Sequence, residues 1–187
     1  MSSINLSIES QQTCLQVARE SIQHGLLHGT ALKIVTSDYA SDLQQKLTTF
    51  VTLHKNGELR GCIGALEAYQ PLINDVAEHA YSAAFKDPRF PALQENEYEQ
   101  IDVTISVLGT PEPMIFENEA DLLQQIRPNI DGLILEHGYN RGTFLPSVWE
   151  QLPDKKDFLN HLKVKAGLSQ QWWDNEVKVS RYETFSF

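Results

Sequence analysis

One short segment of the chain combines residue types that a reactive or ligand-binding site needs. Residues 59–64 read Leu59, Arg60, Gly61, Cys62, Ile63 and Gly64. A cysteine reacts as its thiolate, and a nearby guanidinium stabilises that form. Cys62 would act as a nucleophile or redox thiol, and Arg60 would lower the pKa of Cys62 or hold an anionic group. The two glycines would let a ligand approach the backbone closely.

Residues outside this segment widen the candidate site. A nucleophilic cysteine needs a base, and a histidine such as His54, His79 or His137 would serve, but their spacing does not place any of them beside Cys62. We expect Asp87 and Arg89 to border the same site. The expected ligand-binding residues are Leu59, Gly61, Ile63, Gly64, Asp87 and Arg89.

Structural explanations compete with each of these roles. Cys62 would also suit a small buried position in a tight hairpin, where the glycines only permit close packing. Asp87 and Arg89 would pair with each other locally. Amides at the glycines, with the arginines, would bind a phosphate or carboxylate, although the spacing matches neither a P-loop nor a dinucleotide motif.

The sequence predicts no metal site and identifies no cofactor. His24 and His28 stand four residues apart on an expected helix, a spacing that can hold a metal ion. No third ligand accompanies them, so we interpret them as surface histidines. The cysteines are too few for an iron–sulfur cluster or a structural zinc site.

Composition restricts the class of protein. The 187 residues include 15 basic and 25 acidic side chains, for a net charge of −10, which argues against nucleic acid and anionic membranes as partners. Two distant cysteines, Cys14 and Cys62, are typical of a reducing compartment. With no signal peptide and no apolar run long enough to span a bilayer, we expect a cytoplasmic protein.

A predicted hairpin positions the candidate segment. Residues 50–55 and 58–64 have strand composition and flank Asn56-Gly57, the preferred pair of a type I′ turn. The two-residue loop predicts three facing pairs, Lys55 with Glu58, Leu53 with Arg60, and Val51 with Cys62. Arg60 and Cys62 would then share one face, with Leu59, Ile63, Phe50 and His54 on the other. A bulge at Gly61 would change this register.

The remaining pattern predicts an α+β fold with a largely antiparallel sheet. Helices are expected at residues 10–27, from Pro71 onward, at 119–126 and around 159–166, and strands at 101–107, 132–136 and near 177–179. Cys14 lies on the apolar stripe of the first helix, so we assign it to the core. No linker divides the chain, which indicates a single domain over residues 1–187.

Six ordered segments resemble the AMMECR1 family. They are residues 50–53 with the hexapeptide 59–64, then 83–90, 103–108, 131–133, 142–146 and 165–168. The resemblance implies two α+β lobes with a cleft between them and the hexapeptide near that cleft. It also implies Memo-like and radical SAM proteins as partners by association.

Two hypotheses for function stay open. In the first, the protein is an enzyme that acts on a small substrate in the cleft through Cys62. In the second, it is a non-catalytic module that binds a ligand or a protein in the same cleft. Reactivity of Cys62 distinguishes them, because only the first requires an exposed, activated thiol.

Overall fold

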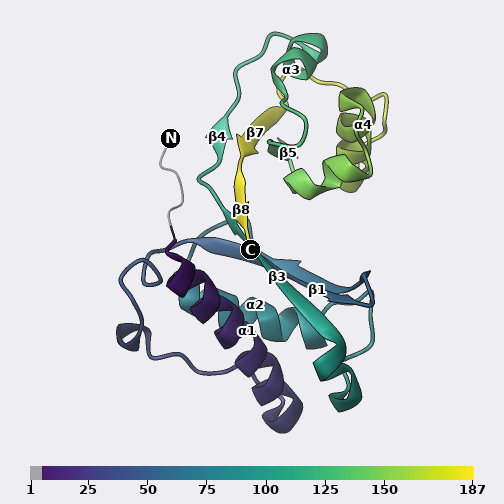
Figure 1. Cartoon of the computed structure of the whole chain (residues 1–187). Helices are drawn as coiled ribbons and strands as arrows, with labels where there is room; N and C mark the ends of the chain where they lie inside the picture. Colours follow the sequence, from purple (N-terminus) through teal and green to yellow (C-terminus); the bar gives the residue numbers. More distant parts are fainter. Residues whose placement is uncertain (1–5) are drawn as a thin grey trace. The chain divides into compact units, whose positions relative to one another are not determined.

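The computed structural model describes residues 6–187, which form two compact units. Unit 1 runs to Leu108 and takes in Phe185–Phe187, and unit 2 is Gly109–Thr184. Figure 1 shows the path of the chain through both units. Helices and antiparallel strands occur together in each unit, which confirms the predicted α+β class.

Two long helices form one layer of unit 1. Helix α1 (Ile8–His28) begins where the Ser7 side chain accepts a hydrogen bond from the Ser10 amide, and it ends at Gly29, whose φ of 71° suits glycine. Helix α2 (Leu72–Phe85) follows Pro71. Both helices confirm the predicted segments, and Cys14 is completely buried between α1 and the rest of the core.

The second layer of unit 1 is a four-stranded sheet. Its strands are β2 (Glu58–Gly64), β1 (Thr48–Lys55), β3 (Ile101–Leu108) and β8 (Thr184–Ser186), in that order across the sheet. Asn56 and Gly57 join β1 to β2 with positive φ at both positions, as the predicted turn requires. Helices α1 and α2 cover one face of this sheet (Figure 1), and β2 is an edge strand.

Residues 6–187 also contain three short 3₁₀ helices. They lie at Thr36–Asp38, Glu95–Gln100 and Pro146–Glu150. The second of them leads directly into β3 and carries Glu97, which is important for the position of Arg60.

Unit 2 contains the other sheet and two helices. Its elements are β4 (Glu112–Pro113), α3 (Glu119–Gln125), β5 (Gly132–His137), β6 (Asn140–Phe144), α4 (Lys155–Lys165) and β7 (Lys178–Tyr182). The strand order is β4-β7-β5-β6. Helices α3 and α4 and strands β5 and β7 confirm the predictions, whereas β4, β6 and β8 were not predicted because strands of two to five residues leave little periodic signal.

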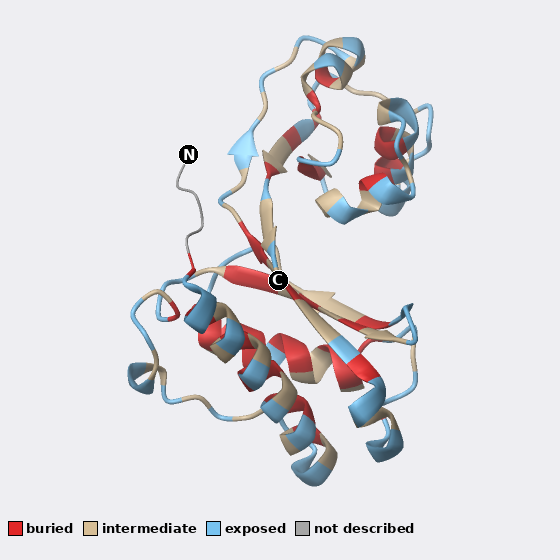
Figure 2. Ribbon diagram, in the orientation of Figure 1, coloured by how far each residue is buried: buried red, intermediate tan, exposed pale blue. Residues whose placement is uncertain are grey.

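Each unit has its own apolar core, visible as red segments in Figure 2. In unit 1 the core lies between the helices and the sheet, and includes Val51, Leu53, Ile105 and Ala80. In unit 2 it surrounds Trp149 and Phe158, whose rings stack 3.7 Å apart. Within residues 6–187, no helix is both long and apolar enough to cross a membrane.

Candidate functional site

A β-bulge at Arg60 changes the predicted register of the hairpin. His54 pairs with Leu59, but the next residue of β1, Leu53, pairs with Gly61. Arg60 is therefore the extra residue of the bulge. Its predicted pairing with Leu53 is wrong, and every residue after it in β2 is shifted by one position relative to the prediction.

The shift places Cys62 on the sheet face that the helices do not cover. Cys62 pairs with Thr52 and not with Val51 as predicted, and the Thr52 hydroxyl donates a hydrogen bond of 3.2 Å to the Cys62 sulfur. Facing residues share a side of the sheet, and so do alternate residues of one strand. His54 therefore lies on the same face as Cys62, and the prediction that it points away is wrong.

The bulge also separates two residues that were expected together. Ile63 pairs with Val51 on the helix-covered face, whereas Leu59 pairs with His54 on the face of Cys62. Phe50, two residues before Thr52, lies on the face of Cys62 as well. The predicted grouping of Leu59, Ile63 and Phe50 is therefore wrong.

Asp87 and Arg89 hold the backbone of Cys62 at the free edge of β2. The Cys62 amide donates to Asp87 Oδ2 over 2.9 Å, and Arg89 Nη2 donates to the Cys62 carbonyl over 3.4 Å. Asp87 Oδ1 accepts from the amide and from Nε of Arg89, and its Oδ2 also accepts from Arg89 Nη2. The structure thus brings three of the predicted site residues together.

The charges of this group are strongly coupled. Arg89 donates hydrogen bonds to Asp87, and this is the main reason why the pKa of Asp87 falls from its ordinary value of 3.8 to about 2. The same bonds raise the pKa of Arg89, and the charge of Cys62 raises it further. Arg89 is therefore a cation that interacts electrostatically with Cys62.

Arg60 has a different partner from the one the sequence suggested. Its Nε and Nη2 donate to the two carboxylate oxygens of Glu97 over 3.1 and 2.9 Å, and Lys55 Nζ donates to the same carboxylate. Arg60 is the main cause that lowers the pKa of Glu97 from 4.5 to about 2. The charge of Arg60 is therefore paired with Glu97, and its role in lowering the pKa of Cys62 stays a prediction.

The glycines of the hexapeptide are required for packing. A Cβ added to Gly61 would lie 2.1 Å from the carbonyl oxygen of Ala83 in α2, and one added to Gly64 would lie 2.4 Å from both the Phe50 ring and the Thr49 carbonyl oxygen. The space that a Cβ would need at either glycine is therefore already filled by other atoms of this chain. Glycine here allows the strand to approach its neighbours, which is the structural explanation given above.

A buried cluster of polar side chains was missed in the sequence. Asp75 Oδ2 accepts hydrogen bonds from the amide and hydroxyl of Thr49, and lies 3.0 Å from His79 Nδ1. Asp75 and His79 are one turn apart on α2, a spacing that could have revealed the pair. Thr49 faces α2, so His79 lies on the opposite side of the sheet from Cys62 and cannot be its base.

A second group of potential ligands lies in unit 2. His137, Asp174 and Glu176 bring one ligand atom each to within 4.8 Å of one another. His137 Nε2 is 3.7 Å from Asp174 Oδ2, and its ring centroid is 4.8 Å from that of Trp172. The three residues are exposed or half-exposed, and Asp174 already accepts from the Glu176 amide. The arrangement is that of polar surface side chains beside an aromatic ring.

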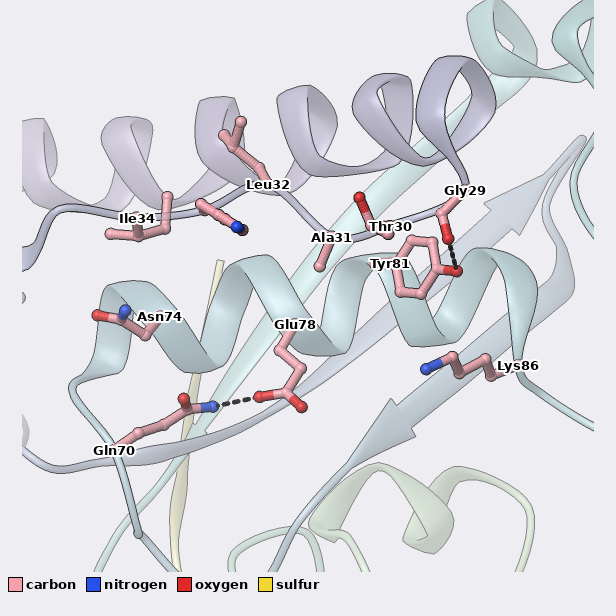
Figure 3. A pocket seen from close by; sticks show the side chains of 11 residues that line it. Gly29, Thr30, Ala31, Leu32, Ile34, Gln70, Asn74, Glu78, Tyr81 and Lys86 are labelled. Carbon is pink, nitrogen blue, oxygen red and sulfur yellow. Dashed lines mark hydrogen bonds between the residues drawn. The ribbon is translucent and has the colours of Figure 1, made fainter.

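Unit 1 also contains a groove of about 540 Å³ between residues 29–34 and the outer side of α2. Figure 3 shows Glu78 and Lys86 among its lining residues, with the Tyr81 hydroxyl bonded to the Gly29 carbonyl. Gln70 donates to Glu78 over 2.8 Å. No residue of the hexapeptide lines this groove.

Known proteins match this chain over most of its length. It is 40% identical to a protein of Methanothermobacter thermautotrophicus, over 97% of this chain and 95% of that protein. It is 39% identical to Protein MJ0810 of Methanocaldococcus jannaschii, over 97% and 91% of the two chains. The crystal structure of uncharacterized protein PH0010 from Pyrococcus horikoshii matches with a TM-score of 0.85 and 32% identity, over 92% of this chain and 88% of that one. The AMMECR1 family model matches residues 15–187, and the chain therefore belongs to the AMMECR1 family.

Proposed function

We propose that Cys62 is a reactive thiol, and that the protein binds a small substrate on which Cys62 acts as a nucleophile or redox thiol. The observation that carries this proposal is the environment of the sulfur of Cys62, a half-buried residue. Thr52 donates a hydrogen bond to it, and Arg89 interacts with its charge. Both kinds of contact favour the charged form of a thiol.

A fixed backbone supports the same proposal. Asp87 and Arg89 bind the amide and the carbonyl of Cys62, so both polar backbone groups at the outer edge are held. Nucleophilic attack benefits from a group that is already positioned for reaction. The position of Cys62 therefore suits chemistry better than a mobile surface thiol would.

One observation favours the alternative of a binding module without chemistry. The Asp87 carboxylate accepts four hydrogen bonds, which use its whole acceptor capacity. With its pKa at about 2, it stays ionised and cannot serve as a general acid near neutral pH. In this alternative, Asp87 and Arg89 form a rigid frame and Cys62 is inert.

Alkylation with iodoacetamide across a pH series distinguishes the reactive thiol from the binding module without chemistry. The labelling rate of Cys62 is followed by peptide mass spectrometry in the folded protein, with Cys14 as the internal control. Cys14 is fully buried, and burial is the main cause that raises its pKa to about 12, so it should label only after unfolding. Fast labelling of Cys62 near neutral pH supports the reactive thiol. Labelling of Cys62 only together with Cys14 would contradict it.

Two further expectations come from the family. The inter-lobe cleft and the association with Memo-like and radical SAM proteins stay predictions. The partner prediction is checked by co-purification of the tagged full chain with each candidate, comparing wild type with Cys62→Ala. Retained binding in the variant, together with an inert thiol, would favour the binding module.

A further inference from the structure

Arg89 keeps one of its nitrogen atoms available for a ligand. A guanidinium has five N–H donors. Nε uses its donor on Asp87, and Nη2 donates to Asp87 and to the Cys62 carbonyl. Among residues 6–187, Nη1 has no hydrogen-bond partner. Two donors of one nitrogen are therefore free beside the Cys62 strand.

The positive member of the Asp87–Arg89 pair is the one presented to solvent. The Arg89 side chain is 55% exposed, whereas the Asp87 side chain is 2% exposed. A molecule that approaches Cys62 from this edge meets the guanidinium and not the carboxylate. The Arg89 guanidinium also lies 5.4 Å above the Phe90 ring, which helps to fix its plane.

The other anion-binding groups expected in this segment are occupied. Glu97 takes up the charge of Arg60, whose side chain is only 10% exposed. The spaces beside the α-carbons of Gly61 and Gly64 are filled by Ala83 and Phe50. Arg89 is thus the exposed cation held directly against the backbone of Cys62.

We propose that the substrate of the Cys62 site is a small carboxylate whose anionic group is bound by Nη1 of Arg89. The carboxylate accepts from the free donors while the rest of the substrate lies beside the Cys62 side chain. A guanidinium suits this group because a hydrogen bond between a charged donor and a carboxylate is short and strong. This inference rests on the proposed reactivity of Cys62.

The test compares two alkylating agents that differ in charge. Iodoacetate and iodoacetamide react in the same way: the Cys62 thiolate forms a sulfur–carbon bond, and iodide leaves with the electron pair of the broken carbon–iodine bond. At Cys62, the labelling rate with iodoacetate is divided by the labelling rate with iodoacetamide. This ratio is then divided by the same ratio measured for free glutathione. This quotient cancels differences in thiolate population and in intrinsic reagent reactivity.

We expect the quotient to fall about threefold or more in Arg89→Gln, the factor that Coulomb's law gives for unit charges about 6 Å apart in water. Arg89→Lys should retain part of the preference, and 0.5 M salt should reduce it in the wild type. Lys86→Gln is the matched control, because it removes an equal charge three residues away that lies over Tyr81. Its quotient should stay at the wild-type value.

The outcomes separate this inference from the proposed function. If Cys62 labels rapidly with iodoacetamide but the quotient is the same in wild type and Arg89→Gln, the carboxylate inference is wrong and the reactive thiol stands. An equal fall in Lys86→Gln and Arg89→Gln would also overturn it, since a general field would then explain the preference. If neither reagent labels Cys62 in the folded chain, the proposed function fails and this inference fails with it.

Discussion

Replacing Glu97 by glutamine should destabilise unit 1 in a strongly pH-dependent way. Glu97 accepts hydrogen bonds from Arg60, Lys55 and the Gln94 amide. Glu97→Gln keeps the shape of the side chain and removes its charge. Arg60, which is buried and already has one nitrogen without a partner, would lose its counterion. Removing one member of a buried ion pair costs about 3–5 kcal/mol of stability.

The pKa of Glu97 gives an independent value for the contribution of its charge to the free energy of unfolding. A value of about 2 in the folded chain, against 4.5 for the free group, corresponds to about 3 kcal/mol. Because the folded-state pKa is lowered, this stability is present above pH 4.5 and is lost as the pH falls toward 2. The difference in the free energy of unfolding between wild type and Glu97→Gln should therefore become smaller by about 2 kcal/mol when the pH is lowered from 7 to 3.

Urea denaturation at the two pH values measures this difference. Far-ultraviolet circular dichroism follows the long helices α1 and α2 of unit 1, while all three tryptophans lie in unit 2 and report on it separately. Glu99→Gln is the control, because Glu99 is exposed on the same 3₁₀ helix. A cost below 1 kcal/mol at pH 7, or a difference equally large at pH 3, would refute the reasoning.

Two further predictions concern the hairpin. Gly61→Ala should lower the free energy of unfolding by roughly 2 kcal/mol or more, because its Cβ would meet the backbone oxygen of Ala83; a near-wild-type urea midpoint would contradict the packing role. His54→Gln should change the alkylation rate of Cys62, because both side chains lie on one face of the sheet. His79→Gln is the control, and an equal change of the rate in that variant would show that the face assignment is wrong.

Local signals in the sequence predicted most of the elements. Asn56-Gly57 identified the hairpin and Pro71 the start of α2, because each depends on backbone conformations that few residues adopt. The alternation in β3 predicted its buried face. These features depend on neighbours in sequence, so no tertiary information was needed.

The bulge shows what sequence patterns could not determine. Gly61 indicated that an irregularity was possible, but the decision between a regular hairpin and a bulge depends on contacts with Ala83 and Glu97, which are distant in the chain. Because of this one extra residue, each later residue of β2 lies on the face opposite to the predicted one. The structure consequently places His54 on the face of Cys62, and it places Arg89 against the Cys62 carbonyl.

The bonds that Asp87 and Arg89 make to Cys62 have a consequence for self-association. An edge strand exposes a row of donors and acceptors that a strand from another molecule can pair with. At Cys62 both of these groups are already bound by side chains, so an incoming strand would have to displace them. Asp87 and Arg89 therefore imitate a neighbouring strand and block edge-to-edge aggregation at the residue where the chain places its thiol.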